Sequence, residues 1–521
     1  MRYIPIILFI LVLTGPLLIW HRLTRAMNPR EHENADRLVV VTPHNDDIRR
    51  EFGRAFDQWH QQKYGTSVVI DWRVPGGSTD IRRMLEAAYQ PYRVNGKLPP
   101  DTNVGLDVIF GGGDFFFDVE LKPLGVLEPM HIDPALLKAA FPDPTLAGVK
   151  LYDLTKSPDG RPTPSWVGVC LSSFGIVYNP DVYHSMGLPL PSPEHGWHDL
   201  TDSRLAGLLA LADPAHSGSA AVAYQMVIQR NMADAEAALF KANPQLAHLS
   251  RAQQGTNAEY QAAIAQGWKR GMSDLLKIAA NARYFVDSST IVPNDVARGE
   301  AAAGIAIDFY ARVTEETVGS NRARFFAPIG ATAITPDPVA ILHGTHGRHL
   351  ELAQHFVEFL LSVPGQRLWE LKVGQPGGPI ERALRRPPIR QDVYNDRTGW
   401  SDQDINPFQT ANGFNQRNDW MALFTDSRPI WVAAWIDSRD ALKRAYATIL
   451  CVPDYNRRQA LIDALADLPI NMSDVQALRR ERISIQTSNG DLDAWRAHQQ
   501  LQWAARFRAH YADLERRARG G

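Results

Sequence analysis

The sequence predicts an α/β protein with two α/β units and a mostly helical C-terminal region. Strand and helix patterns alternate along residues 38–113, and they alternate again along residues 180–315. Such alternation is typical of βαβ units and of a largely parallel sheet. Beyond residue 400 helical patterns dominate, and the last of them is the long amphipathic segment DLDAWRAHQQLQWAARFRAHYADLERRARGG.

The first unit opens with LVVV in RLVVVTPHND, an apolar β-branched run that stops at Thr-Pro and predicts a buried strand. In the next segment Ile48, Phe52, Phe56 and Trp59 recur at helical spacing, and Gly65 ends the predicted helix. SVVIDWRV and LDVIFGGG predict two further strands, and PGGST opens the helix between them.

The carboxyl ends of parallel strands are where α/β sheets bind ligands. In the first unit those ends are Thr42–Asn45, Gly76–Thr79 and Gly111–Gly113. One Gly cluster at a strand end is commonly a tight turn. With three such clusters at corresponding strand ends, a ligand-binding role and a purely structural role are both open. The candidate ligand-binding residues of this unit are His44, Asn45, Gly77, Ser78, Thr79 and Gly112.

In the second unit LLALADP predicts a strand that leads through the hydroxyl-rich loop Ser217–Ser219 into the helix AAVAYQMVIQ. Residues 231–266 have a helical pattern and form a predicted insertion. The stretch Val286–Arg312, VDSSTIVPNDVARGEAAAGIAIDFYAR, predicts a hydroxyl loop, a short helix and a small-residue strand that ends in Asp-Phe-Tyr. We expect the strands on either side of that helix to be neighbours in one sheet.

Hydroxyl residues stand at several predicted helix starts in both units. The free N–H groups at a helix start bind anions, while Ser and Thr at the same place also act as N-caps. Capping alone explains any one of these loops, but several loops from two units suggest a shared anionic or polar ligand. The candidates of the second unit are Ser217, Ser219, Ser288, Ser289, Thr290, Asp308 and Tyr310.

The composition predicts packed globular domains. The chain has 521 residues, of which 45% are hydrophobic and 21% charged, so two to four domains are expected. Its net charge of −2 predicts no nucleic-acid partner. The two cysteines, Cys170 and Cys451, have no metal-ligand spacing, and whether they pair is left open.

The N-terminus predicts a membrane anchor. Residues 3–20, YIPIILFILVLTGPLLIW, carry no charge, and as a helix they would span about 27 Å. No A-x-A-like cleavage site follows, which favours an uncleaved anchor over a cleaved signal. Residues 1–25 are therefore an expected anchor or signal, and the polar residues 26–37 are an expected tether.

The chain resembles extracellular solute-binding proteins of ABC importers, in the subgroup with ferric-ion, phosphonate and sugar-phosphate binders. The motifs run in order over about residues 38–390. They are VVVTPHND, GGSTDIRRML, LDVIFGGG, SSFGIVYNPDVYHSMGLPLP, WHDLTDSRLAGLLALADPAHSGSA, the stretch Val286–Arg312, and LAQHFVEFLLSVPGQRLW. The combination of Tyr-Asn-Pro, Trp-x-Asp-Leu and Ala-Asp-Pro-x-x-Ser-Gly is more specific than any of them alone.

The resemblance implies a two-lobed periplasmic binding protein-like type II fold whose lobes close on a ligand. Lobe 1 would comprise residues 38–171 and 325–400, and lobe 2 residues 172–324, with Ser172 at the first crossover facing the ligand. Residues 401–521 exceed what such a receptor needs and form an expected helical extension. The resemblance also implies a periplasmic or extracytoplasmic location, and a permease and an ATPase as partners.

Three readings of the site remain open. The first is a small anion or zwitterion, since Asp308 beside an anion site suits a ligand that also carries an amine. The second is ferric ion held by His44 and Tyr310, although the family's adjacent tyrosines read Phe309-Tyr310 here and iron(III) prefers phenolate oxygens. No cofactor other than such an ion is expected.

The third reading departs from the receptor class. Thiamin-degrading enzymes resemble these binders and use a cleft cysteine, so an enzyme would need Cys170 to face the cleft. A tethered sensory protein with a partner on its helical C-terminus is a further alternative. The sequence contains no G-x-S-x-G, H-E-x-x-H or Walker motif, which favours a binding protein over an enzyme.

Overall fold

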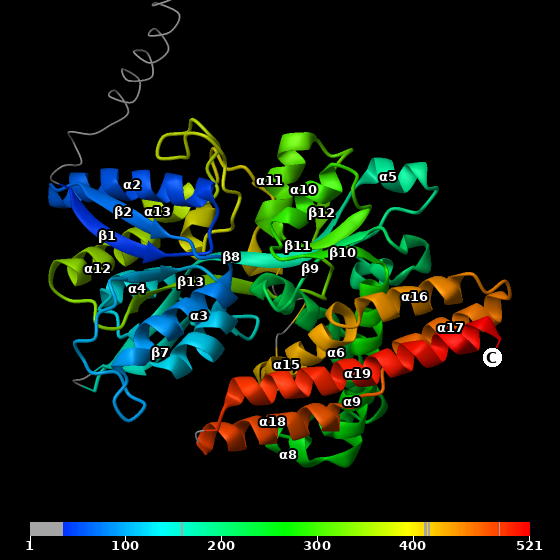
Figure 1. Ribbon diagram of the computed structural model, residues 1–521. Helices are drawn as coiled ribbons and strands as arrows, with labels where there is room; N and C mark the ends of the chain where they lie inside the picture. Colours follow the sequence, from blue (N-terminus) through cyan, green and yellow to red (C-terminus); the bar gives the residue numbers. More distant parts are fainter. Residues whose placement is uncertain (1–34, 158–159, 411–413, 415–416, 489, 521) are drawn as a thin grey trace, which may run out of the picture.

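The computed structural model describes residues 35–157, 160–410, 414, 417–488 and 490–520. It confirms the predicted α/β fold with a helical C-terminal region (Figure 1). The predicted anchor at residues 3–20 lies outside the described residues. Among the helices that are described, none is long and apolar enough to span a membrane.

Lobe 1 is built on parallel strands that follow the predicted order. β1 pairs in parallel with both β2 and β3, and α2 buries Ile48, Phe52 and Phe56 as their spacing predicted. The principal elements of lobe 1 are β1 (Asp36–Val41), α2 (Asp46–Tyr64), β2 (Val68–Arg73), α3 (Ser78–Tyr89), β3 (Val108–Phe110), η2 (Phe116–Leu121), β4 (Leu127–Glu128), α4 (Pro134–Ala140), β7 (Tyr152–Lys156), β13 (Ile334–Leu342), α12 (Gly347–Leu361) and α13 (Val363–Leu368).

Two strands carry the chain between the lobes. β8 (Pro162–Tyr178) pairs with β7 and β13 in its first part, and its last residues, from Phe174 onward, pair with β11 and β12. The chain returns between β12 and β13, and Ile334 at the start of β13 lies opposite Ser173. The path through the sheet is therefore β10-β9-β11-β8-β13-β3-β1-β2.

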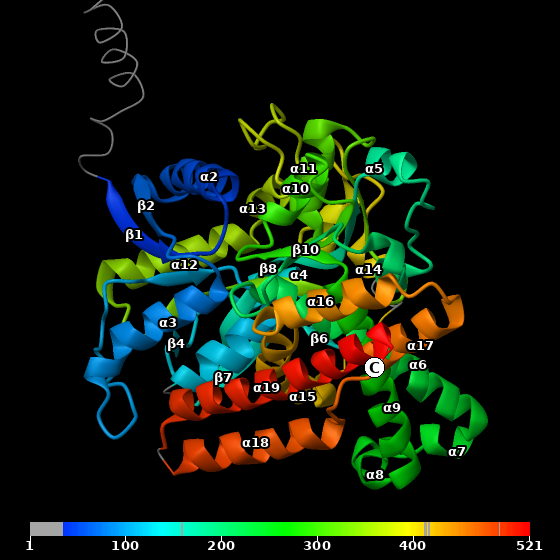
Figure 2. The ribbon, with the colours of Figure 1, turned by 45° about the vertical axis from the view of Figure 1, so that its right-hand side comes forward.

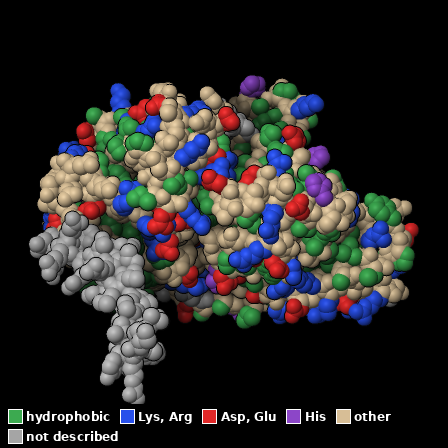
Figure 3. All heavy atoms as spheres, turned by 90° about the horizontal axis from the view of Figure 1, so that it is seen from above, with side chains coloured by type: hydrophobic (Ala, Val, Ile, Leu, Met, Phe, Trp, Pro, Cys, Tyr) green, Lys and Arg blue, Asp and Glu red, His purple; other side chains and the backbone are tan. Residues whose placement is uncertain are grey.

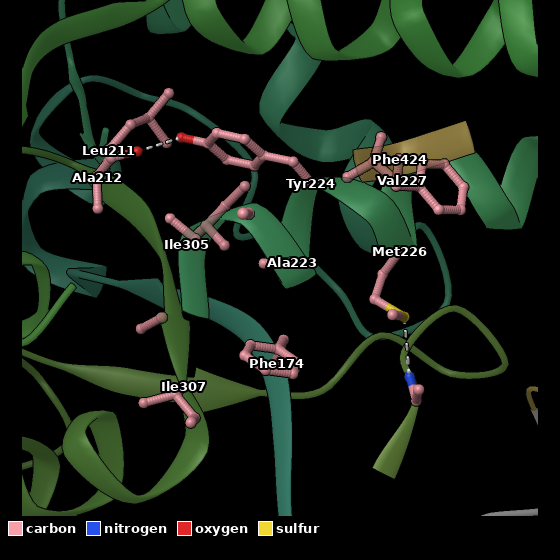
Figure 4. Close-up of a cluster of buried hydrophobic side chains, with 14 of the residues drawn as sticks. Phe174, Leu211, Ala212, Ala223, Tyr224, Met226, Val227, Ile305, Ile307 and Phe424 are labelled. Carbon is pink, nitrogen blue, oxygen red and sulfur yellow. Dashed lines mark hydrogen bonds between the residues drawn. The ribbon is translucent and has the colours of Figure 1, made fainter. Parts of the chain in front are cut away.

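Lobe 2 follows β8 and includes the predicted helical insertion. Tyr224 of α6 donates a hydrogen bond to the carbonyl of Ala212 at 2.8 Å, within the buried cluster of Figure 4. The principal elements of lobe 2 are α5 (Pro180–Ser185), β9 (Leu209–Ala212), α6 (Gly218–Ala242), α7 (Pro244–Ala247), α8 (Arg251–Thr256), α9 (Ala258–Ala280), β10 (Ala282–Val286), α10 (Ile291–Ala297), β11 (Ala303–Ile307), α11 (Asp308–Val318) and β12 (Arg324–Phe326).

Two expectations about the stretch Val286–Arg312 are wrong. β10 and β11 are not neighbours, because β9 pairs with both of them and lies between them. β11 also ends at Ile307, so Asp308, Phe309 and Tyr310 form the first turn of α11. The connection from β10 to β11 therefore crosses β9, which a local sequence pattern does not encode.

The C-terminal extension packs against lobe 2 and lies along the lower side of the molecule in Figures 1 and 2. Trp431 and Trp435 of the extension are buried. Its elements are α14 (Pro407–Thr410), α15 (Asn418–Trp431), the π-helical η8 (Val432–Ile436), α16 (Arg439–Leu450), α17 (Tyr455–Ala466), α18 (Met472–Thr487) and α19 (Leu492–Arg519).

The surface mixes charges of both signs. Acidic and basic side chains are interspersed over the face seen in Figure 3, in keeping with a net charge of −2. Cys170 and Cys451 are both free, the first buried and the second exposed, so the open question of their pairing is settled against a disulfide.

Candidate functional site

A small cavity of about 120 Å³ lies between the two lobes. It opens into a wider mouth of about 840 Å³, and both spaces share His44, Gly77 and Tyr310. Among the predicted ligand-binding residues, the cavity is lined by His44, Gly77, Ser78, Gly112, Ser172, Ser217, Ser219, Ser288, Ser289, Thr290 and Tyr310.

Three predicted residues lie elsewhere. Asn45 borders the mouth, where its side chain caps α2 by accepting from the N–H of Ile48 at 3.2 Å. Thr79 does not line the cavity but faces a separate space beside α15. Asp308 is buried and accepts hydrogen bonds from the N–H and hydroxyl of Ser173 at 2.8 and 3.0 Å, so it turns away from the ligand space.

The lobes touch each other beside the cavity. A β-carbon on Gly77 in lobe 1 would lie 2.9 Å from the backbone oxygen of His216 in lobe 2. A β-carbon on Gly218 would lie 2.4 Å from the hydroxyl oxygen of Ser78. Because real side chains essentially never pack this closely, the two glycines allow the lobes to meet, and the structure is that of a closed cleft.

The hydroxyls around the cavity are of two kinds. Some are used locally: Ser217 caps α6 by accepting from Ala220, and Ser288 and Thr290 bond each other at 2.9 Å. Within the part of the chain that the structure describes, a second group has no hydrogen-bond partner. These hydroxyls belong to Ser78, Ser219, Ser289 and Tyr310, so lobe 1 and lobe 2 both supply free donors to the cavity.

A buried ionic network forms one wall of the cavity, and the sequence reasoning missed its centre. Arg386 contacts Asp337 at 2.7 Å, His44 at 3.1 Å and the hydroxyl of Ser172 at 2.6 Å. Its side chain is 1% exposed and lies over the ring of Phe309 at 4.1 Å. Asp337 also bonds His44 at 2.9 Å, so three lobe 1 segments converge on one ion pair.

The network fixes the charges of its members. Burial alone would raise the pKa of Asp337, but Arg386 and His44 hold that pKa well below its usual range. Burial lowers the pKa of His44 against the opposing pull of Asp337, so the imidazole is neutral at pH 7. The backbone N–H groups of Gly112 and Gly113 donate to Asp337 at 2.6 and 3.1 Å, which ties the glycine loop to the same carboxylate.

No sequence pattern marks Arg386 as a residue of the cavity. It stands in ERALRRPPIR, beyond lobe 2 and far from any strand end, and its neighbour Arg385 looks identical in the pattern. Asp337 lies inside β13, between two prolines, where an isolated carboxylate gives no motif. Other residues that line the cavity without having been predicted include Asp114, Phe174, His216, Asp287, Phe309 and Thr335.

The donor set suits ferric ion poorly. Burial raises the pKa of Tyr310 to about 12, which disfavours the phenolate that iron(III) prefers. His44 already engages Asp337 and Arg386 through Nε2. Among the described residues, no group of three His, Cys, Asp or Glu side chains is placed to hold a metal.

Cys170 does not supply the nucleophile that an enzyme on this scaffold would need. The residue is fully buried in β8, and burial raises the pKa of its thiol well above the usual value. It does not border the cavity, whose β8 residues are Ser172 and Phe174. A thiol in this position is a core residue.

Comparison with known proteins gives matches of two kinds. Residues 164–372 match the family described as bacterial extracellular solute-binding protein. The phosphoglycerate transport regulatory protein PgtC of Salmonella typhimurium is 25% identical over 202 residues, which are 39% of this chain and 40% of PgtC. The chain thus spans well under half the length of that relative.

Solved structures extend the likeness to the fold. The periplasmic binding protein AfuA from Actinobacillus pleuropneumoniae, with exogenous fructose-6-phosphate bound, superimposes with a TM-score of 0.50 at 19% identity. That match covers 77% of this chain and 98% of AfuA. Iron-bound HitA from Pseudomonas aeruginosa gives a TM-score of 0.44 at 17% identity, covering 72% of this chain and 92% of HitA. Residues 164–372 are thus similar to bacterial extracellular solute-binding proteins, and the two-lobed part of the chain shares the fold of AfuA.

Proposed function

We propose that this protein is a receptor that closes its two lobes on a small organic anion and delivers it to an ABC importer. The observation that carries the proposal is the ring of free hydroxyls from both lobes around the cavity. Ser78 belongs to lobe 1, whereas Ser219, Ser289 and Tyr310 belong to lobe 2. Only a ligand between the lobes satisfies donors from both at once.

The helix starts favour an anion at this place. Ser78 is the first residue of α3 and Ser219 the second of α6, so both cavity hydroxyls stand beside N–H groups that lack partners within their helix. Such helix ends carry partial positive charge and bind phosphate or carboxylate oxygens. Arg386 adds a guanidinium at the cavity wall, although Asp337 balances its charge.

The dimensions suit a charged group with an organic part attached. A cavity of about 120 Å³ holds little more than a phosphate or carboxylate group with its neighbours, while the mouth of about 840 Å³ leaves room for a larger part. AfuA is described with fructose-6-phosphate bound and PgtC with phosphoglycerate transport. We therefore favour a phosphorylated or carboxylated organic anion over the zwitterion that Asp308 had suggested.

A binding screen tests the proposal. Thermal unfolding of the full chain should shift upward with sugar phosphates, phosphoglycerates, phosphonates or dicarboxylates, because a ligand bound only by the folded state raises apparent stability. Ferric citrate and polyamines are tested in parallel as ligands of other chemical classes. A shift with ferric salts alone would replace the anion by the ferric ion, and the absence of a shift with every anion would overturn the proposal.

Removing the free hydroxyls should weaken binding. With the anion that gives the largest thermal shift, Tyr310→Phe and Ser289→Ala should each raise Kd roughly tenfold to a hundredfold. Losing one hydrogen bond to a charged ligand costs on the order of 1.5–3 kcal/mol. Calorimetric titration measures the effect, and Tyr455→Phe, which alters an exposed phenol outside the cleft, is the control. Unchanged binding by both variants would show that the ligand lies elsewhere.

Asp114 should make binding depend on pH. Burial, with smaller contributions from Asp118 and Asp337, raises the pKa of this cavity residue to about 7. Above that pH its carboxylate repels a bound anion, so Kd should rise by roughly tenfold between pH 6 and pH 8.5. Asp337 and Tyr310 keep one charge state over this range, because the pKa of Asp337 lies well below it and that of Tyr310, at about 12, lies above it.

The comparison of Asp114→Asn with the parent protein isolates this carboxylate. The ratio of the two dissociation constants at each pH cancels the ionisation of the ligand and of every group that the two proteins share. We expect the ratio to be near one at pH 6 and to favour the variant at pH 8.5. Asp101→Asn, on an exposed loop, should leave the ratio at one throughout. A flat ratio for Asp114→Asn would mean that the carboxyl does not face the anion.

We place the receptor outside the cytoplasm on the strength of its family. A permease and an ATPase are its expected partners, and residues 3–20 are its expected anchor. Fractionation followed by N-terminal sequencing tests the anchor. A mature form that begins after residue 20 and leaves the membrane fraction would contradict it.

A further inference from the structure

The C-terminal extension is fixed to lobe 2. Trp431 and Trp435 pack edge-on against Tyr224 of α6, with ring centres 6.2 and 6.3 Å apart. Tyr446 donates to Asn281 at 3.0 Å in the buried interior. Figure 4 shows Phe424 of α15 in the same apolar cluster as side chains of α6. We therefore expect α15, η8 and α16 to move with lobe 2.

One side chain of α15 reaches across to lobe 1. Arg428 of α15 pairs with Glu120 of η2 at 3.2 Å and donates to the hydroxyl of Thr79 in α3 at 3.3 Å. Its third nitrogen, Nε, donates to the backbone oxygen of Pro214 in lobe 2. Arg428 thus joins three segments that belong to the extension, to lobe 1 and to lobe 2.

Two of the three partners of Arg428, Thr79 and Pro214, lie beside the loops that close over the cavity. Thr79 directly follows the cavity residue Ser78, and Pro214 opens the loop that carries Ser217 and Ser219. The same two loops touch each other where Gly77 faces His216. Arg428 therefore holds from outside the contact that closes the cleft.

Around Arg428 the helices of the extension are not packed tightly against lobe 1. A cavity of about 630 Å³ separates α3 and η2 from α18 and α19 and is bordered by Arg428 itself. Within that open surrounding, the side chains of Arg428 and Glu120 are only 19% and 17% exposed. The attraction between two charges that are this well shielded is screened less by solvent and salt than that of an exposed pair.

We propose that Arg428 is a latch by which the C-terminal extension stabilises the closed cleft. Opening carries Glu120 and Thr79 away with lobe 1, while Arg428 stays with lobe 2, so both contacts exist only in the closed form. The latch then raises the affinity for the solute. A ligand that binds only the closed form binds more tightly when another contact stabilises that form. The coupling between the latch and solute binding is reciprocal, so solute binding also stabilises the contact of α15 with lobe 1.

The inference rests on the proposed closing of the lobes but not on the identity of the solute. Its test is the distance between spin labels on the two lobes of the full chain, measured by pulsed electron paramagnetic resonance. Labels at Lys97 in lobe 1 and Ser185 in lobe 2 are both exposed, and Cys451→Ser removes the exposed native thiol while Cys170 stays buried. The probes are buffer alone, inorganic phosphate and 3-phosphoglycerate.

We expect Arg428→Ala to lower the ratio of closed to open molecules roughly five- to twentyfold under each condition. Glu120→Gln should do the same without altering the extension, and the double variant should be no worse than either, because the two residues share one contact. Arg479→Ala changes an arginine on α18 that borders the same cavity, and it should leave the distances unchanged.

The outcomes separate the latch from the receptor function. Distances that are the same in the parent protein, Arg428→Ala and Glu120→Gln, with and without probe, would overturn the latch. If neither probe changes any distance but Arg428→Ala still opens the parent protein, the latch stands and these anions are not the solute. If Arg428→Ala does not fold, the comparison of Glu120→Gln with the parent protein still tests the latch.

Discussion

Replacing Arg386 with methionine should lower the free energy of unfolding by about 3–5 kcal/mol, because it leaves the buried carboxylate of Asp337 without its main counter-charge. His44 is held neutral by burial and cannot take over that charge. The same change removes the guanidinium from the ring of Phe309 and from the hydroxyl of Ser172. Urea titration followed by circular dichroism measures the loss.

Two further variants make this expectation specific. Arg386→Met combined with Asp337→Asn removes both charges, and it should recover part of the loss because no ion remains buried alone. Arg382→Met removes an exposed arginine of the same loop and should unfold like the parent protein. If Arg386→Met and Arg382→Met unfold at the same urea concentration, the buried ion pair does not stabilise lobe 1.

The carboxylate of Asp337 should also make the stability of the fold depend on pH under acidic conditions. Because the folded-state pKa of Asp337 lies well below its usual range, its stabilising contribution is fully present above about pH 4, the ordinary value for an unfolded Asp. It is lost as the pH falls further towards the folded-state value. Between pH 5 and pH 8, therefore, Asp337 should add no pH dependence to stability, and any that appears comes from groups such as Asp114.

Local sequence patterns were sufficient to predict the main strands and helices of the fold. The apolar β-branched run in β1, the helical spacing of Ile48, Phe52 and Phe56, and the glycine that ends α2 all describe interactions within one segment. The hydroxyl loops were found because the carboxyl ends of parallel strands share one edge of a sheet, whichever strands are neighbours. This is why the loops after β10 and β9 both reach the cavity although the expected order of strands was wrong.

What the sequence could not predict depends on contacts between distant segments. Asp308 stands at the expected strand end, but Ser173 of β8 supplies the two donors that turn it away from the ligand. Arg385 and Arg386 are adjacent, yet the first pairs with Asp402 outside the cavity while the second enters the cavity wall. No spacing rule distinguishes such neighbours, since the partner of each arginine is set by tertiary packing.

The closing of the cleft can be blocked at a single position in lobe 1. We expect Gly77→Val to raise Kd for the solute by roughly a hundredfold, because its β-carbon would already lie 2.9 Å from the backbone oxygen of His216. Overpacking against a backbone atom costs on the order of 3 kcal/mol. The backbone of Gly77 has φ −73° and ψ 179°, a conformation that valine adopts readily, so the open protein should keep its stability.

Gly255→Val serves as the comparison for this change. Gly255 has open space around its β-position, and a substitution there tests only the cost of a branched residue in a short exposed helix. Calorimetric titration gives Kd, and urea titration without ligand gives stability. A Gly77→Val variant that binds as tightly as the parent protein would show that solute binding does not need the loops of Gly77 and His216 to meet. Because Arg428 holds these same loops together from outside, such a result would also remove the reason for a latch at that edge of the cleft.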